Sequence, residues 1–506
     1  MTDDKVWDII VIGGGIAGLT SGTYLARGGK SVLLLEQQDQ PGGCCGSHQS
    51  GGRTVPAASH LVNDPGLING IMRELGAPEI TFIAPDPVYE VTGPCPGKNL
   101  LITSDRELFD RSASELAKDA PREALNQALS TLIELSRQIY YETRQLPLES
   151  PELMSFFKRL TMGFSMQRKL PKSMEYGRIP VGQFLSSVFP GAEMQCLRAA
   201  FRSVVPVRGA RALDLLQLLG NVAEGNVSYP EGGVESLVEN LTGCFQAQGG
   251  VIRTGAKVTS VNVSGGQVTG VTLADGSTFR GDTVVSTIDM KELFFTLLPD
   301  KAAPRLFREK LEKIPLSDSY FTITLDTTLP PETVSGGGKG VRVVNPVVEE
   351  DGLFTSDDPD RVSLFIHFPA PGPGRVGDRS IVQIMAPVRF MYEDNWHSGP
   401  RYEKSAEYHE FSKQYATRII ERADAVVPGL STHIVDMAIA TPVSYRSCTG
   451  NDEGAVFGWR RPRMWRQKVP YVHGLYIAGH WTYPGPGVLK SMMSGKNVGR
   501  IILSGL

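Results

Sequence analysis

The chain has 506 residues, enough for about two to four packing units at roughly 150 residues each. Its 51 Lys and Arg nearly balance 54 Asp and Glu, and the net charge is −3, so no overall basic field exists for binding a nucleic-acid backbone. Hydrophobic residues make up 41% and charged residues 21%, which excludes a largely disordered chain. Glycine stands out, with 55 of 506 residues against a typical proportion of about 7%.

Residues 8–36 predict a strand, a glycine turn, a helix and a second strand. Both strand segments are continuous apolar runs, which is typical of parallel strands buried on both faces. Gly13, Gly15 and Gly18 fit Gly-x-Gly-x-x-Gly between the first strand and the helix. In that context the pattern predicts a dinucleotide site, with the pyrophosphate at the helix N-terminus.

Glu36 ends the second strand, 18 residues after Gly18. At this position a carboxylate can accept hydrogen bonds from both ribose hydroxyls and would repel a 2′-phosphate, so NADP is disfavoured. The sequence holds one complete fingerprint of this kind, and a tightly bound NAD(P) beside another dinucleotide is therefore not expected.

The rest of the chain alternates between helical and strand patterns. Helices are predicted over 105–145, through most of 151–225, and over 234–248 and 403–426. Strands are predicted within 251–287, over 318–326, within 361–391 and over 474–479, the last followed by a final helix. Gly336 to Gly340 lacks the spacing of a phosphate-binding loop and predicts a surface turn.

The six cysteines are too few and too scattered for a disulfide framework, and they fit a reducing cytoplasm. They are Cys44, Cys45, Cys95, Cys196, Cys244 and Cys448. No spacing of Cys or His predicts a metal site. The first seven residues carry acids where a signal peptide needs bases. No apolar run approaches the roughly 20 residues that span a bilayer, so any membrane contact would be peripheral.

Residues 153–174 combine bases with an apolar side and contain no acid. The bases are Lys158, Arg159, Arg168, Lys169 and Lys172, and the apolar side is Phe156, Phe157, Leu160, Phe164 and Met166. This pattern suits a helix lying on the inner face of a membrane. A helix packed within the protein, with its bases in water, is an equal alternative.

Two further motifs carry a family resemblance. Pro41, Gly42 and Gly43 follow Glu36, and Gly479 precedes a run from Pro484 to Gly487 and the final helix. Together they resemble the FAD pattern of the amine oxidase and phytoene desaturase superfamily. Over most of its length the chain resembles phytoene desaturases and carotenoid isomerases, a group that is also similar to retinol saturase.

The resemblance implies FAD as the cofactor. The final helix would point its N-terminus at the flavin pyrimidine edge, and the backbone of Val258 would meet the adenine. The implied cofactor-binding residues are Gly13, Gly14, Gly15, Ile16, Ala17, Gly18, Glu36, Gln37, Gly42, Gly43, Cys44, Val258, Gly479, His480, Gly487, Val488 and Leu489.

Two segments depart from the family pattern. Residues 55–60 replace its usual Phe-Asp-x-Gly stretch, and Cys44 and Cys45 directly follow Gly43. The two thiols could react with the flavin or bond to it, but two small residues packed beneath the ring explain them better. His60 and His480 are the candidate acid or base groups, with a structural role an equal alternative for each.

The expected fold is α/β, a doubly wound Rossmann-like FAD-binding domain with an inserted α+β substrate domain. The FAD-binding domain is assigned 1–104, 226–300 and 446–506; a helical substrate or membrane-facing segment is assigned 105–225, and the strands and helix of the substrate domain 301–445.

The resemblance implies an enzyme that desaturates, saturates or isomerises C–C bonds of an apolar polyene or isoprenoid-like substrate by hydride exchange with flavin N5. One alternative is an FAD-dependent amine or amino-acid oxidase, and another is a tailoring desaturase of a secondary-metabolite pathway. A lipid carrier resembling GDP dissociation inhibitors is disfavoured, because a carrier needs neither Glu36 nor a flavin-facing helix.

Overall fold

The computed structural model describes residues 2–50, 53–56, 61–93, 95, 97–205, 208–330, 340–344, 357–368, 379–461, 463 and 465–505. His60 and residues 336–339 lie outside this range, so the predictions made for them have no structural counterpart.

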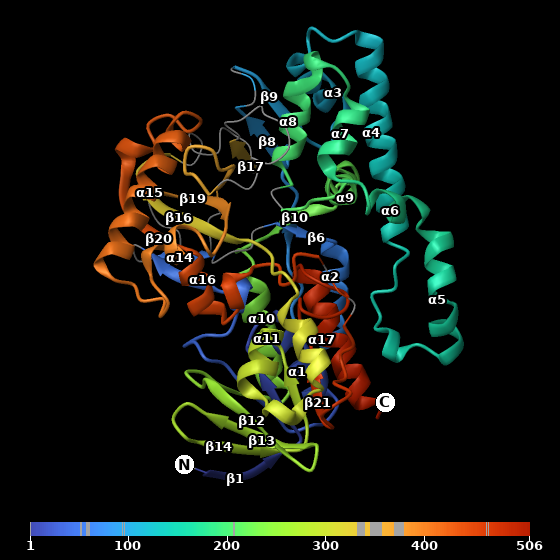
Figure 1. Ribbon diagram of the computed structural model, residues 1–506, viewed down its shortest axis with the longest axis vertical. Coiled ribbons are helices and arrows are strands. Elements are labelled where there is room, and N and C mark those ends of the chain that lie inside the picture. Colours follow the sequence, from blue (N-terminus) through green and yellow to red (C-terminus); the bar gives the residue numbers. More distant parts are fainter. Residues whose placement is uncertain are drawn as a thin grey trace.

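A five-stranded parallel sheet forms the centre of the lower half of the molecule (Figure 1). Its strands, in spatial order, are β11 (Val251–Arg253), β3 (Val32–Leu35), β2 (Ile9–Ile12), β15 (Val284–Ser286) and β21 (Leu475–Ile477). In chain order this is 3-2-1-4-5, a doubly wound arrangement. The predicted Rossmann-like domain is therefore confirmed, and it is assembled from three distant parts of the chain.

Layers on both faces bury this sheet. Ile9 and Val11 pack against α1 (Ile16–Arg27), α10 (Glu235–Ala247) and α17 (Val488–Leu503). Ile10 and Ile12 face the opposite side. That side is covered by a sheet of β1 (Thr2–Trp7), β14 (Thr278–Gly281), β13 (Gln267–Leu273) and β12 (Val258–Ser264). Burial on both faces explains the continuous apolar runs.

Smaller elements complete this half. They are β4 (Ser47–Ser50), β5 (Arg53–Pro56), β6 (Val62–Asn63), α2 (Pro65–Leu75), β7 (Phe82–Ile83), β10 (Val227–Pro230), α11 (Met290–Glu292) and α12 (Arg305–Glu312). Strands β6 and β7 both pair with β10, which ties the segment after residue 61 to the second segment of the domain.

A seven-stranded sheet forms the inserted domain, with α14 (Glu393–His397), α15 (Ala406–Asp424) and α16 (Pro442–Thr449) beside it (Figure 1). Its strands, in spatial order, are β20 (Ile434–Ala440), β16 (Ser319–Thr327), β19 (Ser380–Val388), β18 (Leu364–His367), β17 (Val341–Val344), β8 (Tyr89–Thr92) and β9 (Asn99–Ile102). Its neighbouring strands are antiparallel except for β17 and β8.

Strand pairing and core packing place two segments in a different domain from the one that the sequence predicted. Strands β8 and β9 fall within 1–104, assigned to the FAD-binding domain, yet they complete the seven-stranded sheet of the inserted domain. Conversely, Leu311 and Leu316 fall within 301–445 but pack into the core of the FAD-binding half. A strand pattern shows that a segment forms a strand without showing which sheet it joins, and these assignments needed the long-range pairing.

The predicted helices of 105–225 are present. They are α3 (Arg106–Leu116), α4 (Arg122–Thr143), α5 (Phe156–Lys169), α6 (Pro171–Tyr176), α7 (Val181–Val188), α8 (Gln195–Ser203) and α9 (Ala212–Ala223). Most pack on one another, whereas α5 stands at the periphery (Figure 1). Among the described helices, none combines the length and apolar content needed to cross a bilayer.

Two of the six cysteines are joined. Cys95, in the β8–β9 hairpin, forms a disulfide with Cys196 of α8, with a Cα–Cα distance of 6.0 Å. The remaining cysteines, Cys44, Cys45, Cys244 and Cys448, are free. The scattered spacing of the cysteines did not predict this disulfide, whose two residues are 101 positions apart in the sequence.

Helices α1 and α17 pack in close contact. A Cβ added at Gly495 of α17 would lie 2.5 Å from the Ala17 carbonyl oxygen and 3.0 Å from the Ser21 nitrogen. We expect Gly495→Ala to lower the free energy of unfolding by about 1–3 kcal/mol, because backbone must move to accept the methyl group. Thermal unfolding of the purified protein measures this change.

Gly243→Ala in α10 is the matched control. A Cβ there meets no atom within 4 Å, so the substitution should be neutral or stabilise the helix by up to about 1 kcal/mol. Equal melting temperatures for the two variants would contradict the close packing of α1 and α17.

Candidate functional site

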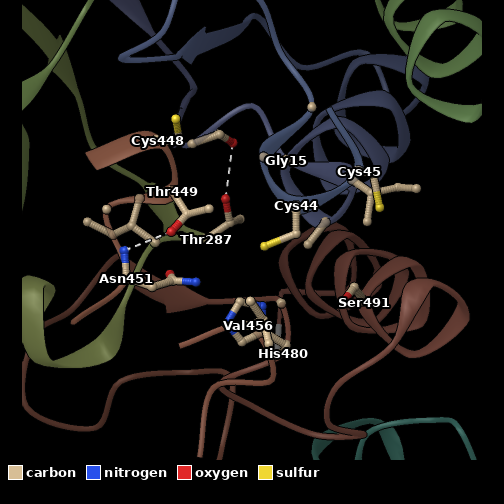
Figure 2. Close-up of a pocket in the computed structure, with 18 of the residues that line it drawn as sticks. Gly15, Cys44, Cys45, Thr287, Cys448, Thr449, Asn451, Val456, His480 and Ser491 are labelled. Atoms are coloured by element: carbon tan, nitrogen blue, oxygen red, sulfur yellow. Dashed lines mark hydrogen bonds between the residues drawn. The ribbon is translucent and has the colours of Figure 1, made fainter. Parts of the chain in front are cut away.

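A cavity of about 730 Å³ is lined by residues at the carboxyl ends of β2, β3 and β15 and by residues of the seven-stranded sheet. Figure 2 shows part of its lining, including Gly15, Cys44 and Thr287. From β2 the chain winds to β3 on one side, while β15 lies on the other. The carboxyl ends of neighbouring strands that wind in opposite directions leave a crevice, which is where ligands bind in sheets of this type.

The glycine turn after β2 forms one wall of the cavity. A Cβ at Gly18 would lie 2.0 Å from the Gly13 carbonyl oxygen, so α1 can pack on this turn only with glycine there. A Cβ at Gly15 meets no protein atom within 4 Å, and Gly15 lines the cavity. The space beside Gly15 and the N-terminus of α1 suits an anion held by backbone amides.

Glu36 braces this turn from the end of β3. Its side chain is 6% exposed, one carboxylate oxygen accepts a hydrogen bond from the Gly14 nitrogen at 2.6 Å, and the other accepts from the Gln38 nitrogen at 2.9 Å. Burial raises the pKa of Glu36. Each oxygen keeps a second lone pair, so the carboxylate can still accept from ribose hydroxyls in the cavity that it lines.

The segment after Glu36 returns to the glycine turn. The Gly42 nitrogen donates to the Gly14 carbonyl oxygen at 2.9 Å, and Gly43 and Cys44 line the cavity. Burial raises the pKa of Cys44 to about 11 and that of Cys45 to about 12, and the two sulfur atoms point in different directions (Figure 2). Because the thiolate is the reactive form of cysteine, this supports a packing role over reaction with a flavin.

The closing motif forms the wall opposite Glu36. Gly487 has φ 112° and is the N-cap of α17, and together with Val488 and Ser491 it lines the cavity. The N-terminus of α17 therefore opens onto the cavity, where its dipole favours negative charge. Gly479 also lines the cavity, and its nitrogen donates to Ser494 Oγ at 3.0 Å.

His480 lies at the same end of the cavity (Figure 2). Burial lowers its pKa to about 4, so the imidazole is neutral at physiological pH. Within the described residues, its Nε2 is buried and makes no hydrogen bond. The side chain can thus serve as a neutral hydrogen-bonding group, but not as a cationic acid.

Three of the predicted cofactor-binding residues do not line the cavity. Gly14 contacts Glu36 through its nitrogen, Gly18 packs against Gly13, and Leu489 is buried in the core between the helices. The other fourteen do line it: Gly13, Gly15, Ile16, Ala17, Glu36, Gln37, Gly42, Gly43, Cys44, Val258, Gly479, His480, Gly487 and Val488.

Sequence reasoning missed the contribution of the segment after β15 and of the loop after α16. Thr287 donates to the Ile12 and Gly13 carbonyl oxygens, each at 3.0 Å (Figure 2). The fully buried Asp289 accepts from the Lys291 nitrogen at 2.6 Å and from the Asp452 nitrogen at 2.9 Å, and burial raises its pKa to about 6. The sequence offered one weak signal for these segments, the glycine-bounded stretch Gly450-Asn-Asp-Glu-Gly454.

Asp289 therefore fixes the loop after α16 against the end of β15. Both segments contribute to the cavity wall, through Thr287, Ile288 and residues 446–451.

The seven-stranded sheet closes the far end of the cavity with an aromatic and apolar wall. The lining residues there are Tyr89, Tyr320, Phe365, His367 and Met385 of the sheet, with Leu61, Val204, Val456 and Phe457 beside them. Trp481 and Tyr483 of the closing motif do not take part. Trp481 packs edge-on against Trp459 in the core, and Tyr483 donates to the Pro147 carbonyl oxygen.

Comparison with known proteins gives a consistent result. The family model "Flavin containing amine oxidoreductase" matches residues 16–331. The chain is 27% identical to a chloroplastic prolycopene isomerase of Arabidopsis thaliana, over 97% of this chain and 82% of that protein. It is 24% identical to a lycopene-forming phytoene desaturase of Pantoea ananas, over 98% and 99% of the two chains.

Solved structures share the fold. Cyclohexylamine oxidase from Brevibacterium oxydans has a TM-score of 0.60 at 13% identity, and 99% of each chain is covered. Putrescine oxidase bound to putrescine has a TM-score of 0.64 at 13% identity, again with 99% of each chain covered. At these identities the likeness concerns the fold alone.

Glu36 is the residue on which we expect cofactor retention to depend most clearly. Replacing it with alanine removes the brace on the Gly14 nitrogen and the acceptor for the ribose, so Glu36→Ala should purify with several-fold less FAD. The ratio of flavin to protein absorbance measures this. Glu36→Gln, which keeps one acceptor oxygen, should lose less FAD.

Glu134→Ala serves as the control. Glu134 is exposed on α4, and it is distant in sequence from the residues that line the cavity. Unchanged flavin content in Glu36→Ala would show that the ribose lies elsewhere.

Proposed function

Since this chain belongs to the flavin containing amine oxidoreductase family, we propose that it uses FAD to desaturate, saturate or isomerise C–C bonds of an apolar polyene or isoprenoid-like substrate. The protein is an FAD-dependent oxidoreductase. Relatives that match nearly the whole chain are named for carotenoid reactions, one for an isomerisation and one for a desaturation. Their names support the substrate class proposed here.

The observation that carries the proposal is the continuity of the cavity. Its wall includes the glycine turn and Glu36 as well as Phe365 and Met385 of the seven-stranded sheet. A cofactor seated on the turn and an apolar substrate against the sheet would share one water-poor space. Hydride exchange with a carbon centre requires such a space and few acid or base groups.

The chain's residues hold and tune the cofactor. Gly15 and the N-terminal amides of α1 suit the pyrophosphate, and Glu36 suits the ribose. The N-terminus of α17 would stabilise negative charge on a flavin bound in the cavity, and the neutral His480 imidazole would offer it a hydrogen bond. When bound, FAD supplies hydride exchange at N5. The apolar wall excludes water, which protects the reduced state.

Amine oxidation is the competing activity on this fold. A protonated amine is stabilised by aromatic faces or carboxylates. Trp481 of the closing motif packs in the core against Trp459, and Tyr483 donates to the Pro147 carbonyl oxygen. The described residues at the sheet end of the cavity include aromatic side chains but no carboxylate that would pair with an ammonium group. A tailoring desaturase of a secondary-metabolite pathway would use the same chemistry on another apolar chain.

Anaerobic reduction of the bound flavin tests this proposal. We expect a lipid extract in liposomes to bleach the long-wavelength absorption band of the holoenzyme, and putrescine and cyclohexylamine to leave it unchanged. Free FAD mixed with the same extract is the control for non-enzymatic reduction. Bleaching by the amines alone would contradict the proposal.

We also propose that the protein is cytoplasmic and docks on the inner face of the membrane through residues 153–174. Phe156, Phe157 and Leu160 are 65%, 76% and 66% exposed, and α5 stands apart from the molecular body (Figure 1). The four free cysteines suit the reducing cytoplasm. In that compartment we expect the Cys95–Cys196 disulfide to be reduced.

A second basic segment lies beside this helix. Arg159 of α5 and Arg466 line a common cavity of about 90 Å³, together with Trp465. Arg461, Arg463 and Arg466 are exposed, and within the described residues none of the three forms an ion pair. Basic groups around an exposed apolar helix complement an anionic lipid surface.

Joint replacement of Phe156 and Phe157 with serine should reduce co-sedimentation with phosphatidylglycerol liposomes by at least about tenfold. Burying one such side chain contributes about 1.5–3 kcal/mol, and about 1.4 kcal/mol is a tenfold change. Leu306→Ser, at an 80% exposed position on α12, is the control. Wild-type co-sedimentation of the double variant would rule out α5 as the docking element.

A further inference from the structure

Three tyrosines on strands from different parts of the chain have hydroxyls with a raised pKa. Tyr89 comes from β8, Tyr229 from β10 and Tyr320 from β16. Burial raises the pKa of Tyr89 to about 12. Burial, reinforced by the neighbouring Tyr89, also raises the pKa of Tyr229 and of Tyr320. Their hydroxyls therefore keep their protons at physiological pH.

Among the residues that the structure describes, these hydroxyls have no hydrogen-bond partner. Within the described residues, Tyr89, Tyr229 and Tyr320 make no side-chain hydrogen bond, and the Tyr229 hydroxyl is fully buried. Tyr445 provides the contrast, since its hydroxyl bonds with Thr322 Oγ1 at 2.7 Å. Tyr89 and Tyr320 are partly buried and line the cavity, so a ligand there can supply the acceptor that each hydroxyl lacks among the described residues.

The surroundings of the pair restrict what can bind there. Neighbouring wall residues such as Phe365, Met385 and Phe457 are apolar and can satisfy no donor. Glu36 and the glycine turn belong to the FAD-binding half, whereas Tyr89 and Tyr320 belong to the seven-stranded sheet. The hydroxyls therefore face the part of the cavity left for the substrate, and as protonated phenols they offer donors to an acceptor on it.

We propose that Tyr89 and Tyr320 donate hydrogen bonds to an oxygen atom of the substrate, so that the substrate is an apolar chain bearing a hydroxyl or carbonyl group. A plain hydrocarbon would leave both donors unsatisfied. The inference rests on the proposed function, because it assigns a substrate class to the same cavity. It makes the two tyrosines specificity-determining residues.

Ligand binding to the oxidised holoenzyme tests the inference without turnover. The probes are tetrahydrogeraniol and the alkane of the same branched skeleton, which differ only in the hydroxyl. Each is titrated from detergent micelles, and perturbation of the flavin spectrum gives its Kd. Wild type, Tyr89→Phe and Tyr320→Phe are compared, with Tyr471→Phe as control because Tyr471 is exposed and packs against Phe307 of α12.

Each of the two cavity variants should weaken tetrahydrogeraniol binding about three- to tenfold, the usual effect of one hydrogen bond. Alkane binding should not weaken in any variant, and in the two cavity variants it should tighten, because each removes a donor that the alkane leaves unsatisfied. Tyr471→Phe should change neither Kd. Retained alkane binding and normal flavin content also verify that the variants are folded.

Three results would overturn the inference. If alcohol and alkane respond equally to the substitutions, the tyrosines do not recognise oxygen, and the proposed function stands. If the variants lose FAD, the hydroxyls serve the cofactor instead. If neither probe binds wild type while amines bleach its flavin, the proposed function falls together with the inference.

Discussion

The site depends on the close approach of α1 to the turn after β2. A Cβ atom at Gly18 would lie 2.0 Å from the Gly13 carbonyl oxygen, so α1 approaches the turn closely at this residue. The close approach sets the N-terminus of α1 directly at the cavity. Helix α17 then packs on α1 through Gly495, so its own N-terminus reaches the same space. The N-termini of two helices thereby open onto one cavity, and both positions follow from the absence of side chains where the backbones cross.

Hydrogen bonds between segments that are distant in the chain also fix the shape of the cavity. Glu36 fixes the glycine turn to the end of β3, while Asp289 joins β15 to the loop after α16 across 163 residues. Each carboxylate accepts from backbone nitrogen atoms, and each loses solvation by burial. The geometry of the cavity is thus set by main-chain contacts on both sides, and the substrate wall is free to vary in its side chains.

The sequence predicted the parts of this site whose signals are local. The turn from Gly13 to Gly18 lies between a recognisable strand and helix. Glu36 follows Gly18 by 18 residues, a spacing that identifies it as the candidate ribose-binding carboxylate. The side chain of Leu489 lies in the core and not in the cavity wall. A single step along a helix turns a side chain by about 100°, and the sequence pattern did not fix the face. Tyr89 and Tyr320 gave no signal, since they meet only through the pairing of strands hundreds of residues apart in the chain.

The late position of β21 and α17 has a consequence for biosynthesis. Strand β21 pairs with β15, and Gly487, Val488 and Ser491 supply one wall of the cavity. A nascent chain still lacking these residues exposes the edge of β15 and has only part of a cofactor site. We therefore expect flavin loading to follow translation of the last segment, and until then the unpaired edge of β15 is open to pairing with other chains.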